Sequence, residues 1–232
     1  MQTHVKGGLA VMRRDGNPVA AIVDYGMGNL FSVKNALHYV GVEAVITADS
    51  QAIVDADAVI LPGVGAFGEA MDRLNRLQLV DVLREVAGSG KQLVGICLGL
   101  QLLMSESEEF GIHAGLDIIP GRVIGFNQHP ERQDTMKVPQ ICWSEVFPAK
   151  AWTSTMIEGV SHPTYMYFAN SFYVVPNNPE VALTKSNYYG IEYCSAVQHD
   201  NVTAFQFHPE KSGADGLRIY KNLATKLKGE RL

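Results

Sequence analysis

The stretch LVGICLGLQLL, residues 93–103, places a cysteine between two glycines where a buried apolar run meets a helical pattern. Gly95, Cys97 and Gly99 have the form G-x-C-x-G, the thiol counterpart of the G-x-S-x-G turn that exposes a nucleophile between a strand and a helix. In such a turn, side chains at the two glycine positions would collide with neighbouring backbone, and the N–H groups of a helix start favour the reactive thiolate. The alternative is that Cys97 is an inert core thiol, as free cysteines often are.

A candidate base and its orienting group follow in VTAFQFHPEKSG, residues 202–213. His208 ends an apolar strand pattern, Pro209 stops it, and Glu210 follows. Residues i and i+2 of an extended chain project to the same side, so Glu210 can reach the His208 ring and leave the other ring nitrogen for a thiol. A strand-end histidine alone is usually structural, but this setting favours a Cys97–His208–Glu210 triad.

The segments on either side of residues 93–103 predict a single α/β domain with a largely parallel central sheet and flanking helices. Helical spacing of apolar residues covers 29–40 and 67–86, and such helices are the crossovers that parallel strands need. Between 110 and 207, short segments rich in β-branched and aromatic residues predict an added antiparallel portion, and 212–229 predicts an amphipathic final helix. Four apolar runs predict the parallel strands: 19–25, 42–47, 56–62 and 91–97.

Composition narrows the class of protein. The 232 residues are 47% apolar and 19% charged, with a net charge of -5, which favours neither nucleic acid nor an anionic membrane as a partner. Three cysteines without a CxxC pair suit a reducing, cytoplasmic compartment, and no HExxH or carboxylate cluster predicts a metal site. Residues 1–18 lack the apolar run of a signal peptide, so we expect a loose tail there and one domain over 19–232.

A glycine-rich loop, PGVGAFG at residues 62–68, lies between a predicted strand and a predicted helix. It contains a literal G-x-G-x-x-G, but the next strand ends in Cys97 rather than in the acid that would hold a ribose hydroxyl, which argues against a dinucleotide site. Its backbone N–H groups, with that of Leu98, could instead stabilise a developing negative charge. Such an oxyanion donor is worth about 10²–10³ in rate.

Five motifs follow one another in the order and spacing of a known family. The sequence resembles the glutaminase subunits of imidazole glycerol phosphate synthase, which are class I, triad-type glutamine amidotransferases with a flavodoxin-like fold. The resemblance covers roughly residues 19–228. The motifs are DYGMGN (24–29), ILPGVGAF (60–67), GICLGLQLL (95–103), KVPQICW (137–143) and FQFHPEKS (205–212).

The resemblance implies roles for individual residues and needs no cofactor. Cys97 would attack the side-chain amide carbon of glutamine and form a glutamyl thioester, His208 would move the protons, and Glu210 would orient His208. The positions that match the family's oxyanion loop and its substrate-binding groups are Gly63, Val64, Gly65 and Leu98 for the loop, and Gln101, Asn170, Ser171 and Phe172 for the substrate.

The resemblance also implies a partner. Ammonia released into water at neutral pH is mostly protonated and no longer nucleophilic, so a glutaminase without an acceptor site should dock against one. In the family this partner is a (β/α)₈ barrel cyclase that forms a heterodimer with the glutaminase, receives ammonia and makes imidazole glycerol phosphate and AICAR in histidine biosynthesis. We expect Lys211, beside the triad, to face that interface.

Two departures from the family pattern widen the range of functions that the sequence allows. Cys142-Trp143-Ser144 replaces a glycine and an asparagine around the tryptophan, and Asn170-Ser171-Phe172 stands where histidine-serine-tyrosine is usual.

A related glutaminase could feed a sugar-amidating enzyme of surface polysaccharide synthesis. The chain could also be a non-catalytic scaffold of a synthase, or a cysteine peptidase on the same fold. The complete triad argues against the scaffold, and the glycine loop with Gln101 argues against a peptide substrate.

Overall fold

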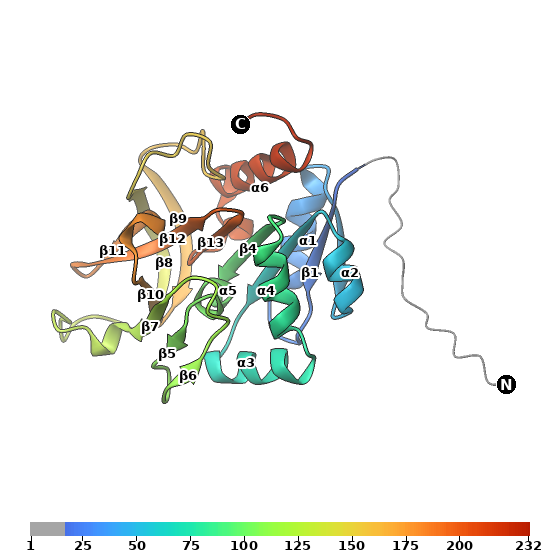
Figure 1. Cartoon of the computed structure of the whole chain (residues 1–232). Helices are drawn as coiled ribbons and strands as arrows, with labels where there is room; N and C mark the ends of the chain where they lie inside the picture. Colours follow the sequence, from blue (N-terminus) through green and yellow to red (C-terminus); the bar gives the residue numbers. More distant parts are fainter. Residues whose placement is uncertain (1–16) are drawn as a thin grey trace.

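The computed structural model describes residues 17–232, so most of the tail predicted over residues 1–18 lies outside the described part of the chain. Within that part, the strands form one large mixed sheet (Figure 1). The strands are β1 Val19–Val23, β2 Glu43–Thr47, β3 Ala58–Gly63, β4 Gln92–Cys97, β5 Glu106–Ser107, β6 His113–Ala114, β7 Gly121–Gly125, β8 Gln140–Pro148, β9 Thr164–Asn170, β10 Phe172–Pro176, β11 Ala182–Tyr188, β12 Ile191–His199 and β13 Val202–Phe205.

The helices connect and cover these strands. They are α1 Leu30–Tyr39, α2 Ser50–Asp55, α3 Phe67–Arg76, α4 Val80–Gly88, α5 Leu98–Leu102 and α6 Gly213–Leu227, with short 3₁₀ helices η1 Phe126–Gln128, η2 Pro179–Val181 and η3 Pro209–Lys211.

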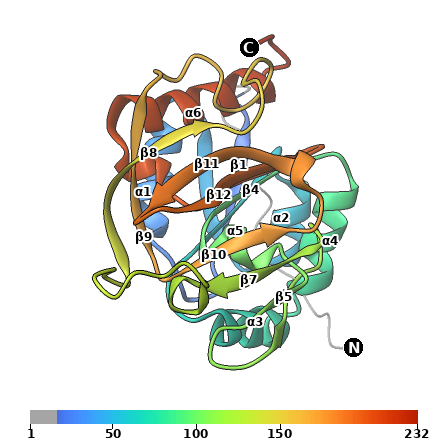
Figure 2. The same ribbon diagram turned by 90° about the vertical axis from the view of Figure 1, so that its left-hand side faces the viewer.

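The sheet has the two parts that the sequence predicts. Its order is β2-β1-β3-β4-β13-β12-β10-β7-β5-β6, and the first four strands and β13 are parallel. The strands β8 to β12 pair antiparallel, and Figure 2 shows them in front of the parallel part. The prediction of an α/β domain with an added antiparallel portion is confirmed, but one strand of the predicted antiparallel range 110–207 was misplaced, because β13 pairs parallel with β4.

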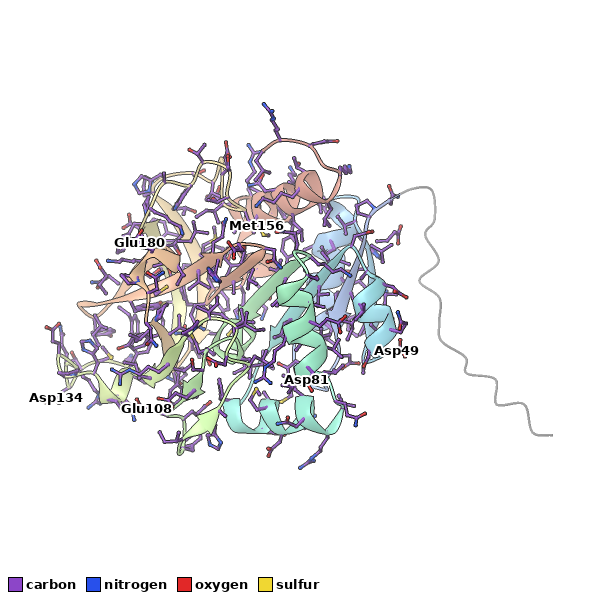
Figure 3. All side chains as sticks on the ribbon, in the orientation of Figure 1. Asp49, Asp81, Glu108, Asp134, Met156 and Glu180 are labelled. Carbon is purple, nitrogen blue, oxygen red and sulfur yellow. The ribbon has the colours of Figure 1, made fainter. Side chains whose placement is uncertain are left out.

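Two apolar clusters cover the two faces of the parallel strands, because alternate side chains of a strand point to opposite sides. Ala20 and Ile22 of β1 pack with α1 and α6, whereas Ala21 and Val23 pack with α2, α3 and α4. In Figure 3 the exposed side chain of Asp49 stands out from the ribbon, whereas the buried Met156 lies near α6.

The single helix predicted over residues 67–86 is wrong in one respect, because the chain forms two helices, α3 and α4. Gln78 between them has φ 57°, in the left-handed region that ends a helix. The turn lets the N–H of Leu79 bond to the carbonyl oxygen of Leu74 at 2.9 Å and buries Leu79 completely. Apolar spacing continues across this break, so periodicity alone joins the two helices.

Among residues 17–232, no helix has both the length and the apolar character that a bilayer crossing requires. The same residues bring together no group of three or more His, Cys, Asp or Glu side chains that could hold a metal ion.

Candidate active site

Cys97 lies at the sharp turn between β4 and α5. Its backbone has φ 55° and ψ -110°, a conformation that L-residues rarely adopt. A Cβ added to Gly99 would lie 1.8 Å from the carbonyl oxygen of Leu61, and one added to Gly95 would lie 2.9 Å from the Ala204 Cβ. The two glycines are therefore required by the close packing of the turn against the neighbouring strands.

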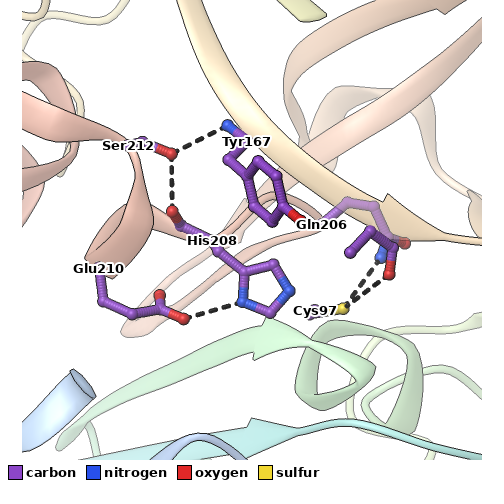
Figure 4. A network of polar contacts seen from close by, with 7 residues as sticks. Cys97, Tyr167, Gln206, His208, Glu210 and Ser212 are labelled. Atoms are coloured by element: carbon purple, nitrogen blue, oxygen red, sulfur yellow. Dashed lines mark hydrogen bonds and ion pairs between the residues drawn. The ribbon is translucent and has the colours of Figure 1, made fainter. Parts of the chain in front are cut away.

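His208 and Glu210 lie in contact, although Glu210 belongs to the 3₁₀ helix η3 and not to the extended chain on which the prediction was based. His208 precedes η3, and its Nδ1 lies 2.8 Å from Oε1 of Glu210, with side chains only 4% and 1% exposed. The hydroxyl of Ser212 donates to the carbonyl oxygen of His208 at 2.6 Å and accepts from the N–H of Tyr167 at 3.0 Å. This network, seen in Figure 4, fixes the backbone that carries the imidazole.

The second ring nitrogen of His208 faces the sulfur of Cys97 (Figure 4). Burial alone would lower the pKa of His208, but hydrogen bonds and negative charge from Cys97 and Glu210 outweigh it and raise that pKa from 6.5 to about 10. The same sulfur lies 3.8 Å from Nε2 of Gln206 and 3.9 Å from the carbonyl oxygen of Ala169. The imidazole is thus held between a carboxylate and a thiol, and it favours its charged form.

The glycine-rich loop ends β3 beside the cysteine, since Gly63 and Cys97 are paired in the parallel register. Gly63 is packed too tightly for a side chain, because a Cβ there would lie 2.3 Å from the hydroxyl of Tyr25. Gly65 has φ 101°, which favours glycine, and an added Cβ would lie 2.6 Å from Cε of Met27. The loop can therefore approach the sulfur through its backbone.

A cavity of about 300 Å³ opens in front of the sulfur. Its lining includes all of the predicted site residues except Gly63, which packs against Tyr25, and Glu210, which lies behind His208. The lining residues are Val64, Gly65, Cys97, Leu98, Gln101, Glu109, Pro139, Ala169, Asn170, Ser171, Phe172, His208 and Lys211.

Side-chain amides hold the far wall of this cavity. Nε2 of Gln101 donates to the carbonyl oxygen of Phe172 at 3.0 Å and to Oε1 of Gln206 at 3.1 Å. Nδ2 of Asn170 donates to the same carbonyl at 3.0 Å, whereas its buried Oδ1 has no hydrogen-bond partner within residues 17–232. The segment predicted to hold substrate is thus anchored by the glutamine predicted to bind it.

Sequence reasoning missed two residues of the site. Glu109 is buried in the cavity wall, accepts the N–H of Phe67 at 2.6 Å, and has a pKa raised by burial. It lies in a loop without periodicity, so no local pattern identifies it. Gln206 is fully buried beside the sulfur. The sequence does contain a signal for it, because an amide side chain between Phe205 and Phe207 at an apolar strand needs a buried hydrogen-bond partner.

The departures around Trp143 form a polar network outside the cavity lining. The Cys142 sulfur lies 3.3 Å from the Ser144 hydroxyl, which accepts from Gln140 at 2.8 Å, and Gln140 accepts from Tyr193 at 2.9 Å. The Trp143 side chain points the other way and is 53% exposed. Asn170 and Phe172, in contrast, line the cavity.

The chain matches known proteins over almost the whole described fold. Residues 21–227 match the family "Glutamine amidotransferase class-I". Imidazole glycerol phosphate synthase subunit HisH of Chlorobaculum tepidum is 43% identical over 203 residues, 88% of this chain and 98% of the relative. HisH of Aquifex aeolicus is 45% identical over 212 residues, which are 91% of this chain and 97% of the relative.

Solved structures agree in fold. The structure of PurLQS from Thermotoga maritima gives a TM-score of 0.68 at 20% identity and covers 91% of this chain and 99% of the other. The glutaminase domain of CTPS from Trypanosoma brucei gives a TM-score of 0.63 at 15% identity and covers 93% of this chain and 96% of the other.

The chain belongs to the class-I glutamine amidotransferases. Within that class it belongs with the HisH glutaminase subunits of imidazole glycerol phosphate synthase, the enzyme of histidine biosynthesis, as the identity and coverage of the relatives show.

Proposed function

We propose that Cys97, His208 and Glu210 hydrolyse the side-chain amide of glutamine to glutamate and ammonia. The observation that supports this most directly is the position of the His208 ring, hydrogen-bonded to Glu210 at 2.8 Å and facing the Cys97 sulfur at the edge of the cavity. Histidine in that position can take the thiol proton and return it to a leaving group.

The first half-reaction releases ammonia. The thiolate attacks the amide carbon, the carbon–oxygen double bond opens to an oxyanion, and backbone N–H groups of Val64, Gly65 and Leu98 stabilise its charge. As the carbonyl re-forms, the carbon–nitrogen bond breaks and the imidazolium of His208 gives its proton to the leaving nitrogen. A glutamyl thioester on Cys97 and free ammonia remain.

The second half-reaction regenerates the thiolate. Neutral His208 takes a proton from water, whose oxygen attacks the thioester carbon through a second oxyanion. The carbon–sulfur bond then breaks and glutamate leaves. Glu210 stabilises the imidazolium through the 2.8 Å contact between its Oε1 and Nδ1 of His208. Such acid–base help contributes about 10²–10⁴ in rate.

The cavity wall provides groups for the amino-acid end of glutamine. The carboxylate of Glu109 carries the charge that an α-ammonium group requires, and it lies on the same cavity as the sulfur. The anchored Asn170-Ser171-Phe172 segment offers backbone groups to the rest of the substrate. A cavity of about 300 Å³ fits a small amino acid better than a folded peptide chain.

Ammonia would pass to a partner subunit, a cyclase with a (β/α)₈ barrel. An exposed face of β8 and β9 supports a docking surface there, with Ile141 61%, Trp143 53% and Tyr165 54% exposed. Large apolar side chains that remain this exposed on one sheet face mark protein interfaces. The same strand β9 leads to the site, since the carbonyl oxygen of Tyr167 accepts the N–H of His208 at 2.9 Å.

The test is glutaminase activity with and without the cognate cyclase, for the unmodified chain and for Cys97→Ala. We expect glutamate release that needs Cys97, together with transfer of the amide nitrogen to the cyclase product. Glutamate release by Cys97→Ala would refute the mechanism. Full activity with no stimulation by the cyclase, and transfer of nitrogen only to a sugar-amidating acceptor, would refute the partner.

A further inference from the structure

Two buried oxygen atoms near the triad have no hydrogen-bond partner among residues 17–232: Oε2 of Glu210 and the hydroxyl of Tyr220. The Glu210 side chain is 1% exposed and Tyr220 is 3% exposed, so bulk water does not compensate either atom. Buried polar atoms without a partner are uncommon, and those beside an active site require an explanation. Oε2 of Glu210 is a hydrogen-bond acceptor, and the hydroxyl of Tyr220 can donate a hydrogen bond.

The fold brings these two residues together. Glu210 lies in η3, which α6 follows directly, and a Cβ added to Gly216 of α6 would lie 2.0 Å from the carbonyl oxygen of Pro209. Tyr220 is one helical turn after Gly216 and so shares the face of α6 that packs against η3. Burial and the negative charge of Glu210 both raise the pKa of Tyr220, which means that the phenol lies within the field of this carboxylate.

We propose that Tyr220 is a positioning residue whose hydroxyl donates a hydrogen bond, through one bridging water molecule, to Oε2 of Glu210. This rests on the proposed function, in which Glu210 orients His208. With Oε2 held by Tyr220, the carboxylate keeps its orientation, and Oε1 remains free to accept from Nδ1–H of His208.

The position of Tyr220 separates its role from substrate binding. It is absent from the cavity lining, and it packs instead in the apolar cluster between α6 and α1. Its loss should therefore change kcat and the pH profile while the KM for glutamine stays constant. A purely structural tyrosine would change only the stability of the fold.

The experiment compares Tyr220→Phe with the unmodified chain, each in complex with the cyclase, by measuring glutamate release from pH 5 to 10. Phenylalanine keeps the ring and removes only the hydroxyl. We expect kcat to fall about tenfold, the effect of one charge-assisted hydrogen bond, with KM unchanged. The basic limb of kcat/KM should move to lower pH by about one unit, because a less firmly oriented Glu210 raises the pKa of His208 less.

The matched control is Tyr193→Phe, which removes another buried phenol hydroxyl, one that donates to Oε1 of Gln140 at 2.9 Å. We expect it to lower the unfolding midpoint and to leave the basic limb in place. In a Glu210→Ala background, Tyr220→Phe should have no further effect on kcat, because the acceptor oxygen is gone.

Two results would overturn this inference while the proposed function stands: a pH profile of Tyr220→Phe that superposes on that of the unmodified chain, or an equal loss of kcat in both backgrounds. If the unmodified complex released no glutamate, the proposed function would fail, and this inference with it.

Discussion

The carbonyl oxygen of Leu61 occupies the space that any side chain at Gly99 would need, since a Cβ there would lie only 1.8 Å from it. Leu61 is in β3, and Gly99 follows the cysteine in α5. This contact holds the start of α5 against the neighbouring strand and gives Cys97 its strained backbone, with φ 55°. The reactive geometry thus depends on a residue that has no side chain.

Replacing Gly99 with alanine should therefore destabilise the fold and displace the thiol. We expect the free energy of unfolding to fall by about 3 kcal/mol, at the upper end of overpacking effects, and glutaminase activity to fall more than tenfold. Urea unfolding and glutamate release are the measurements.

Gly88→Ala is the matched control. A Cβ at Gly88 meets no atom within 4 Å, and this glycine lies at the end of α4, so alanine there should be neutral or stabilising by about 0.5–1 kcal/mol. Equal stability of the two variants would show that the contact with Leu61 does not constrain the turn.

The same turn shows why much of this site could be predicted from sequence. Gly95, Cys97 and Gly99 are adjacent in the chain, and His208 and Glu210 are two residues apart, so local geometry carries the information. The strands β1 to β4 were equally clear, because buried strands are continuous apolar runs, whereas β13 was assigned to the antiparallel portion although it pairs parallel with β4.

What sequence could not predict depends on contacts between distant segments. Glu109 reaches the cavity only because its loop meets the start of α3, 42 residues earlier in the chain. The orphan oxygen of Glu210 and the hydroxyl of Tyr220 become a pair only when α6 packs against η3. The division of residues 67–86 into two helices depends on the burial of Leu79, which periodicity does not show.

Glu109→Gln should weaken glutamine binding. The side-chain oxygen of the variant can still accept the N–H of Phe67, so the loop stays in place while the charge for the α-ammonium group is lost. We expect KM to rise about 10–100-fold, as for the loss of one hydrogen bond to a charged group.

The rate of Cys97 alkylation by iodoacetamide should stay unchanged in this variant. Glu108→Gln, the half-buried neighbour outside the cavity lining, is the control. An unchanged KM for Glu109→Gln would remove it from the substrate site.

The pKa of His208 provides a test that needs no substrate. In the folded chain this pKa is raised from 6.5 to about 10, so His208 keeps a proton that the unfolded chain loses. Its charge therefore contributes stability that is complete below pH 6.5 and disappears as the pH rises through about 10. Cys97→Ala removes one of the two groups that raise the pKa. We expect NMR titration of the imidazole to give a lower pKa in this variant than in the unmodified chain. The same pKa in both proteins would mean that the thiol does not interact with the ring.

Lys211 connects the site to the expected interface. Its Nζ lies 5.7 Å from the centre of the Tyr167 ring, and it lines the cavity mouth beside the exposed face of β8 and β9. Lys211→Glu should therefore weaken the complex with the cyclase, because reversing a charge at an interface leaves like or unpaired charges buried together. Calorimetric titration should show an affinity loss of about tenfold or more. Lys221→Glu makes the same change on an exposed position of α6 and should leave the affinity unchanged. If both variants bound the cyclase as the unmodified chain does, Lys211 would lie outside the interface and the docking surface would have to be sought elsewhere on the molecule.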